Sequence, residues 1–235
     1  MVNILSNRII KRLTSFFLIC FSLVLLIRLV QDEFYTVNNY DPMIEPSMKI
    51  SYDVKSDKIK RCFVNVLKRY ENLHQYHIHL HQKQLSNSTM SAQPVIKWNN
   101  LFTGIKEYKI ILGFYVMDSD ILVEDIPNQV LEGWFAHELG HISDYEQYTN
   151  FEMLLYGIKY LLSSSFKKKV EHEADYIALK KGFRKEIIAT KKYILTEGLF
   201  SDRYTSIIKK YYLPIEALES VEKEPEDTLS GIYHE

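Results

Sequence analysis

The chain has 235 residues, of which 46% are hydrophobic, and its formal net charge at pH 7 is −1. This length suits one globular domain with a full hydrophobic core. The charge balance argues against nucleic acid as a partner, since the short lysine runs at 167–169 and 209–210 are typical of solvated helix ends. The two cysteines, Cys20 and Cys62, offer no disulfide within the globular part, so cysteine usage does not indicate a compartment.

The N-terminal segment combines a basic start with a long apolar run. Arg8, Lys11 and Arg12 precede residues 13–30, which are eighteen mostly apolar residues. This length is enough for an α-helix to cross a bilayer with some local thinning, and no small-x-small cleavage site follows it. We therefore predict a signal anchor, a single transmembrane helix at 13–30, in preference to a cleaved signal peptide or a buried helix of a soluble protein.

The basic residues also predict an orientation and a division of the chain. Lysine and arginine tend to remain in the cytoplasm, so 1–12 is expected to be a cytoplasmic n-region and the catalytic domain to be extracytoplasmic, in the periplasm or the extracellular space. Residues 31–51 are expected to be a linker because they contain two prolines and no sustained periodicity. The folded domain is then 52–221, and 222–235 is a mobile tail.

The first part of the folded domain is predicted to be a helix followed by strands. Apolar residues recur at helical spacing from 59 to 70, and 76–84 alternates as a strand does. His77, His79 and His81 share one face of that strand. They are a candidate for a second metal site, but a solvated or edge face is favoured because alternate strand positions converge poorly on one ion. Further strands are expected at 90–98 and 108–116.

The strongest chemical signal is His137-Glu-Leu-Gly-His141, a complete H-E-x-x-H motif. Pro127 suits the first turn of a helix, and apolar residues between 130 and 142 predict a buried amphipathic helix around the motif. Positions i and i+4 project to the same side of a helix, so the two imidazoles can bind one metal ion. Glu138 then lies beside the metal, where a carboxylate can accept a proton from water and pass it to a leaving amine. The alternative is a pair of helix histidines that are hydrogen-bonded in the core or on the surface.

A second motif, Glu171-His-Glu-Ala-Asp175, begins thirty residues after His141, in a segment with helical spacing that ends near Gly182. A carboxylate from a second helix is a usual third ligand for a two-histidine site, so Glu171 is a candidate for this role. Asp175, one turn further on, could hold a ligand imidazole by its other ring nitrogen. Three residues remain as alternative ligands: Asp144, His172 and Glu173.

Together the two motifs resemble those of the gluzincin metallopeptidases, in particular the family that contains HtpX, Ste24 and OMA1-like enzymes, whose signatures are H-E-x-x-H and a later E-x-x-A-D. The resemblance covers residues 131–183. Outside this span we see no multi-helix membrane domain, so a minimal form of the family is expected. The resemblance implies one bound Zn²⁺ and Glu138 as the general base. It also implies that Asp175 does not bind the metal but hydrogen-bonds to a histidine that does. The implied zinc ligands are His137, His141 and Glu171.

The same resemblance implies a zincin-like α+β fold, in which a small mixed sheet packs on the active-site helix and the C-terminal part is mostly helical. By this analogy, the strand before that helix would offer the backbone of 110–114 to an extended peptide, although an ordinary sheet strand is an equal alternative. Residues 151–162 are too few to cross a bilayer and are predicted to form a helix near the cleft or at the membrane surface. Arg203 and Tyr204 are candidates to assist the oxyanion. Further helices are expected at 187–195 and 204–218.

These features predict a membrane-anchored, zinc-dependent endopeptidase that hydrolyses a peptide or protein substrate, with Glu138 as general base. The alternative is a noncatalytic descendant in which zinc staples two helices and the domain binds or scaffolds an envelope partner. The intact Glu138 favours the enzyme, because a purely structural zinc site has no need of that carboxylate.

Overall fold

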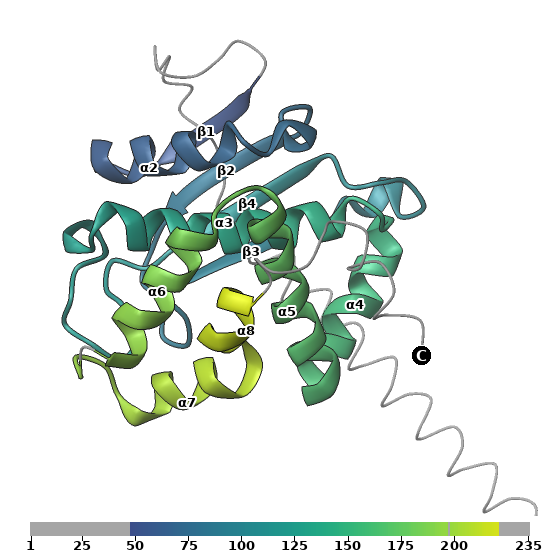
Figure 1. Ribbon diagram of the computed structural model, residues 1–235. Helices are drawn as coiled ribbons and strands as arrows, with labels where there is room; N and C mark the ends of the chain where they lie inside the picture. The colour runs from purple at the N-terminus through teal and green to yellow at the C-terminus, as the bar shows by residue number, and fades with distance from the viewer. Residues whose placement is uncertain (1–47, 197, 221–235) are drawn as a thin grey trace, which may run out of the picture. The chain divides into compact units, whose positions relative to one another are not determined.

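The computed structural model describes residues 48–196 and 198–220, and within them the protein has the expected α+β fold (Figure 1). Four strands form one mixed sheet: β1 (Lys49–Asp53), β2 (His77–Gln82), β3 (Met90–Pro94) and β4 (Glu107–Leu112). The same ranges contain seven α-helices: α2 (Asp57–Leu67), α3 (Asn128–Tyr145), α4 (Asn150–Leu162), α5 (Ser164–Lys180), α6 (Arg184–Thr196), α7 (Asp202–Tyr211) and α8 (Ile215–Ser220). Three short 3₁₀ helices complete the described elements: η1 (Glu71–Leu73), η2 (Trp98–Asn100) and η3 (Val123–Asp125).

The sheet places strand β3 at one of its two edges. The strand order is β1-β2-β4-β3; β1, β2 and β4 run parallel, and β3 runs antiparallel to β4. Neighbouring parallel strands need a crossover connection, which α2 provides between β1 and β2. Strand β4 therefore has a neighbour on both sides, whereas β3 has one edge without a sheet partner in the described part of the chain.

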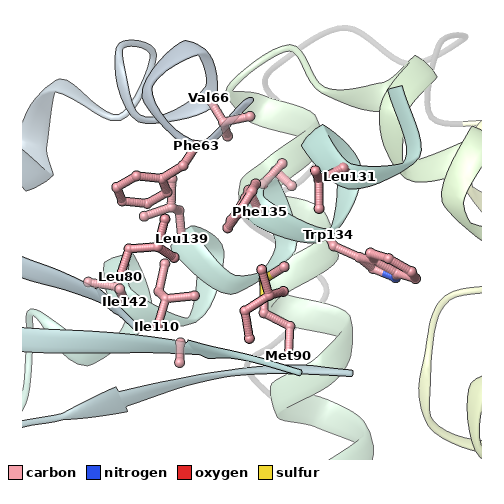
Figure 2. Packing of buried hydrophobic residues seen from close by; sticks show 14 of the residues in the cluster. Phe63, Val66, Leu80, Met90, Ile110, Leu131, Trp134, Phe135, Leu139 and Ile142 are labelled. Atoms are coloured by element: carbon pink, nitrogen blue, oxygen red, sulfur yellow. The ribbon is translucent and has the colours of Figure 1, made fainter. Parts of the chain in front are cut away.

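The hydrophobic core lies between one face of the sheet and the helices α2 and α3. Figure 2 shows Leu80 and Ile110 of the sheet beside Ile142 of α3. Phe63 of α2 extends this layer, since its ring centroid lies 5.3 Å from that of Phe135 in α3. Burying a side chain of this size contributes roughly 1.5–3 kcal/mol. This packing holds α3 firmly against the sheet.

The other side of α3 packs against α5 and α6 at very short distances. A Cβ atom at Gly140 would lie 2.5 Å from the backbone oxygen of Ala174 in α5. A Cβ atom at Gly133 would lie 2.2 Å from Oγ1 of Thr190 in α6. Real Cβ atoms do not approach other atoms this closely, so both contacts require glycine in α3.

The two strands nearest α3 in the sequence are shorter than their patterns predicted. The segment 108–116 leaves the sheet after Leu112, at Gly113, where a Cβ atom would lie 2.7 Å from the backbone oxygen of Tyr115. The segment 90–98 leaves the sheet at Pro94. Buried apolar side chains continue beyond both strand ends, which is why the pattern overestimated the lengths.

Two further elements differ from the sequence-based expectation. The helix predicted at 204–218 is divided into α7 and α8 at Pro214, which has no N–H with which to continue a helix. Strand β1 lies at the end of the segment predicted to be a linker, 31–51. Its two apolar side chains, Ile50 and Tyr52, are only partly buried, and so short an alternation does not distinguish a strand from a linker.

Helix α4 confirms the helix predicted at 151–162 and has a local start signal. The side chain of Thr149 accepts a hydrogen bond from the backbone of Glu152, and the Glu152 carboxylate accepts one from the backbone of Thr149. This reciprocal capping box satisfies two N–H groups at the start of the helix. The inner side of α4 buries Tyr156, whereas the outer side leaves apolar residues such as Leu162 exposed.

The expectation of a membrane protein with a transmembrane helix needs correction. In the described ranges, 48–196 and 198–220, no helix combines the length and the apolar character that a bilayer crossing requires. The segment assigned as the anchor, 13–30, lies outside the described residues, and so do 1–12, 222–235 and most of the predicted linker.

Candidate metal centre

Two helices bring three potential metal ligands together. Helix α3 carries His137 and His141 one turn apart, and α5 carries Glu171. Oε2 of Glu171 lies 3.1 Å from Nε2 of His137 and 3.5 Å from Nε2 of His141. All three side chains are buried, and one ligand atom from each lies within 4.8 Å of the others. Among the described residues, this is the one group of three or more His, Cys, Asp or Glu side chains that could hold a metal ion.

Small residues inside the two motifs explain why the helices meet at this point. Gly140 immediately precedes His141, and Ala174 lies nearly one helical turn after Glu171. The backbone of α5 at Ala174 lies directly against α3 at Gly140, where a Cβ atom would have no room. This close approach brings Glu171 within reach of both histidines.

Asp175 contacts His137 on the opposite side of the imidazole from Glu171. Its Oδ1 lies 2.9 Å from Nδ1 of His137, so with the proton on Nδ1 the lone pair of Nε2 is directed towards Glu171. Oδ2 of Asp175 accepts hydrogen bonds from Nζ of Lys191 at 2.8 Å and from the backbone N–H of Leu213 at 3.2 Å. Burial alone would raise the pKa of Asp175, but Lys191 and His137 hold it below its usual value.

The charges within the group are strongly coupled. Burial alone would raise the pKa of Glu171, but hydrogen bonds with His137 and His141 hold it well below its usual value. Burial alone would lower the pKa of His137, whereas hydrogen bonds with Asp175 and Glu171 raise it to about 10. Histidine binds a metal through a neutral imidazole, so a metal entering this group would displace a proton.

Glu138 lies in the same helix turn as the two histidines and is also buried. Burial raises the pKa of its carboxyl group, and the nearby His141 and His137 lower it in part. The carboxylate accepts a hydrogen bond from the backbone N–H of Ala92 in β3. This carboxylate is therefore fixed between the potential ligands and the sheet edge.

The hydrogen-bond pattern of β3 directs the Ala92 N–H away from the sheet. Residues bonded to the neighbouring strand alternate along an antiparallel pair; the Thr89 carbonyl accepts from the N–H of Gly113, directly after β4, and the Val95 N–H donates to Glu107 of β4. Ala92 lies three residues from each, so its N–H faces the open edge, next to Glu138.

The expectation that 110–114 offers its backbone to a peptide is wrong, because β4 is already paired with β2 and β3. The edge beside the group belongs to β3.

Two tyrosines that no sequence motif indicates lie against the group. The Tyr160 hydroxyl of α4 donates a hydrogen bond to Oε1 of Glu171. The ring centroid of Tyr212 lies 5.1 Å from that of His137. The chain contains 17 tyrosines, and no local pattern distinguishes these two from the others. Only the packing of α4 and of the segment after α7 identifies them.

The alternative ligands lie outside the group. Oδ2 of Asp144 accepts a hydrogen bond from the Tyr156 hydroxyl at 2.8 Å. His172 and Glu173 follow Glu171 directly, and successive residues of a helix project to different sides. The structure therefore favours Glu171 over these three residues as the partner of the histidines.

The residues proposed to assist the oxyanion have other partners. Arg203 forms an ion pair with Asp118 at 3.1 Å. The hydroxyl of Tyr204 accepts a hydrogen bond from Oγ1 of Thr89 at 3.4 Å. Neither partner, Asp118 or Thr89, is one of the three potential ligands.

The histidines of β2 follow the predicted alternation but do not form a second group. The apolar residues between them are buried, whereas the histidines are partly exposed on the other face. Nε2 of His77 lies 2.6 Å from Oγ of Ser51, and Nδ1 of His81 lies 2.5 Å from Oδ2 of Asp53. Within the described ranges these side chains do not converge as potential metal ligands.

Comparisons with known proteins add no assignment: no protein-family model matches the chain, and no curated protein or solved structure matches it.

Proposed function

We propose that this protein is a zinc-dependent peptidase of the gluzincin kind, with Zn²⁺ held by His137, His141 and Glu171 and with Glu138 as the general base. The observation that carries the proposal is a buried carboxylate, Glu138, next to a three-ligand group that does not need it for metal binding. The two sequence motifs and the packing of the mixed sheet against helix α3 support the same reading.

The residues present fit a zinc ion. Zinc prefers imidazole nitrogen and carboxylate oxygen, and three protein ligands with one open position are typical of catalytic sites. The Nε2 atoms of His137 and His141 both face Oε2 of Glu171, and Asp175 supports the tautomer of His137 that zinc binding requires. When bound, zinc would polarise a peptide carbonyl and lower the pKa of a water molecule.

Glu138 has the environment that a general base needs. Its raised pKa brings it closer to the working pH, so it can accept a proton from water and later donate it to the leaving amine. The nearby Ala92 N–H lowers this pKa in part, which shows that the carboxyl group lies beside β3. The open edge of β3 supports a role in substrate binding, because an extended peptide can pair with the backbone of an edge strand.

The decisive experiment separates catalysis from metal binding. Glu138→Gln should reduce cleavage of a peptide library by at least about 100-fold, because loss of a general base costs this much or more. Zinc content and the unfolding temperature should stay as in the wild type. Glu132→Gln is the matched control on the same helix, and it should retain full activity.

The noncatalytic alternative predicts a different result. If zinc has only a structural role and connects α3 to α5, the wild type binds zinc but cleaves no peptide in the library. Undiminished cleavage by Glu138→Gln would refute the base assignment. Removing zinc with a chelator should abolish cleavage, and adding zinc should restore it.

A further inference from the structure

A buried lysine lies behind the candidate metal centre. Lys191 of α6 is only 4% exposed, and its Nζ lies 2.8 Å from Oδ2 of Asp175. Burying an ammonium group is costly unless it is paired and hydrogen-bonded. The sequence gives no sign of this residue's position, because sixteen residues separate it from Asp175 and it lies on another helix.

The contacts of Asp175 divide between its two oxygens. Oδ1 faces Nδ1 of His137 at 2.9 Å, whereas Oδ2 is shared by Lys191 and the backbone N–H of Leu213 at 3.2 Å. The carboxylate therefore has no freedom to rotate without losing a partner. Lys191 also lies 5.0 Å above the ring of Tyr212, and that ring lies against His137. Asp175 and Tyr212 both lie against His137 from outside the metal-binding group. Lys191 therefore contacts both of them.

We propose that Lys191 is a positioning residue of the metal centre: it holds Asp175 in the orientation that keeps the Nδ1 proton of His137 hydrogen-bonded and leaves Nε2 free for a metal. The inference rests on the proposed metal site but not on peptidase activity. In this proposal the hydrogen bond with Asp175, and not the contact with Tyr212, is the route by which Lys191 acts on the metal. Outer partners of this kind typically change metal affinity by about 10- to 100-fold.

A double-mutant cycle on zinc affinity tests this directly, with the full chain, Zn²⁺ alone and a competing chromophoric chelator. Lys191→Met should weaken zinc binding by about 10-fold or more, and Asp175→Asn should weaken it to a similar extent. The double variant should bind zinc no more weakly than Asp175→Asn alone, because the lysine then has nothing left to orient. A general packing role would instead give losses that multiply.

Two further variants keep the test independent of folding defects. Lys191→Arg retains the positive charge and should recover most of the zinc affinity lost in Lys191→Met. Lys192→Met removes the neighbouring lysine, which is 55% exposed and paired with Glu219, and should leave the affinity unchanged. If Lys191→Met does not fold, weak zinc binding by a folded Lys191→Arg variant would overturn the proposal.

The outcomes for the two proposals are distinct. Unchanged zinc affinity in Lys191→Met, or losses that multiply fully in the double variant, overturns the role of Lys191 while the metal site stands. Absence of zinc binding by the wild type overturns both. Zinc binding without peptide cleavage overturns the proposed enzyme and leaves the Lys191 test intact.

Discussion

The contact between α3 and α5 offers the sharpest test of how the candidate centre is built. Replacing Gly140 by alanine adds one methyl group, whose carbon would lie 2.5 Å from the backbone oxygen of Ala174. Ordinary contacts begin at 3.4 Å, so the helices must separate by 3.4 − 2.5, or about 0.9 Å. No rotamer change can absorb this shift, because the opposing atom belongs to the backbone.

The expected cost can be worked out from two opposing effects. Overpacking a core contact costs roughly 1–3 kcal/mol, and alanine regains about 1 kcal/mol over glycine in a helix interior. The net loss of unfolding free energy is then about 0–2 kcal/mol, and the fold survives. The metal site is less tolerant, since coordination distances allow only about 0.2 Å of variation. Moving Glu171 away from His137 and His141 by several times that amount should reduce zinc affinity at least about 10-fold.

Gly157→Ala provides the matched control for this prediction. Gly157 also lies inside a helix, but a Cβ atom there meets nothing within 4 Å. This variant should gain about 1 kcal/mol of stability from helix propensity and should bind zinc as the wild type does. Chemical denaturation and chelator competition measure the two quantities. A Gly140→Ala protein with wild-type zinc affinity would refute the argument that this contact positions Glu171.

Three further predictions follow from single contacts. Glu171→Gln should reduce zinc affinity by more than about 100-fold, more than the loss of an outer partner, whereas Asp144→Asn should leave it unchanged; the opposite result in chelator competition would reverse the ligand assignment. Thr149→Ala removes the capping box with Glu152 and should lower the unfolding free energy by about 1 kcal/mol in urea denaturation; an unchanged value would show that the cap contributes nothing. Burial lowers the pKa of Lys109 from 10.5 to about 8, so between these values the unfolded chain binds more protons than the folded one, and stability should rise with pH. Lys109→Met should remove this rise, and parallel pH profiles of the two proteins would contradict the prediction.

The potential metal ligands could be predicted because each of the two motifs lies within about one helical turn. The spacing of His137 and His141 needs only a helix to bring both rings to one side. The pairing with Glu171 rested on the resemblance, and the structure brings the three side chains together at the Gly140 contact. The same small residues that belong to the motifs turn out to be the ones that let the helices touch.

The substrate edge could not be predicted in the same way. The segment 108–116 is the last strand candidate before α3, and this order favoured it as the border of the site. The structure instead inserts β4 between β2 and β3, so β3 is the strand beside Glu138. Strand order depends on hydrogen bonds between distant segments, and alternation along one strand does not record which neighbour it will have.

The sequence by itself determined the helical and strand periodicities and the ligand types and spacing within each motif, because these depend on neighbours a few residues apart. Tertiary structure alone decided that β3 forms the open edge, that Tyr160 and Tyr212 enclose the ligands, and that Lys191 reaches Asp175. These are contacts between segments whose separation along the chain says nothing about their distance in space. Their geometry exists only once the core between the sheet, α3, α5 and α6 has packed.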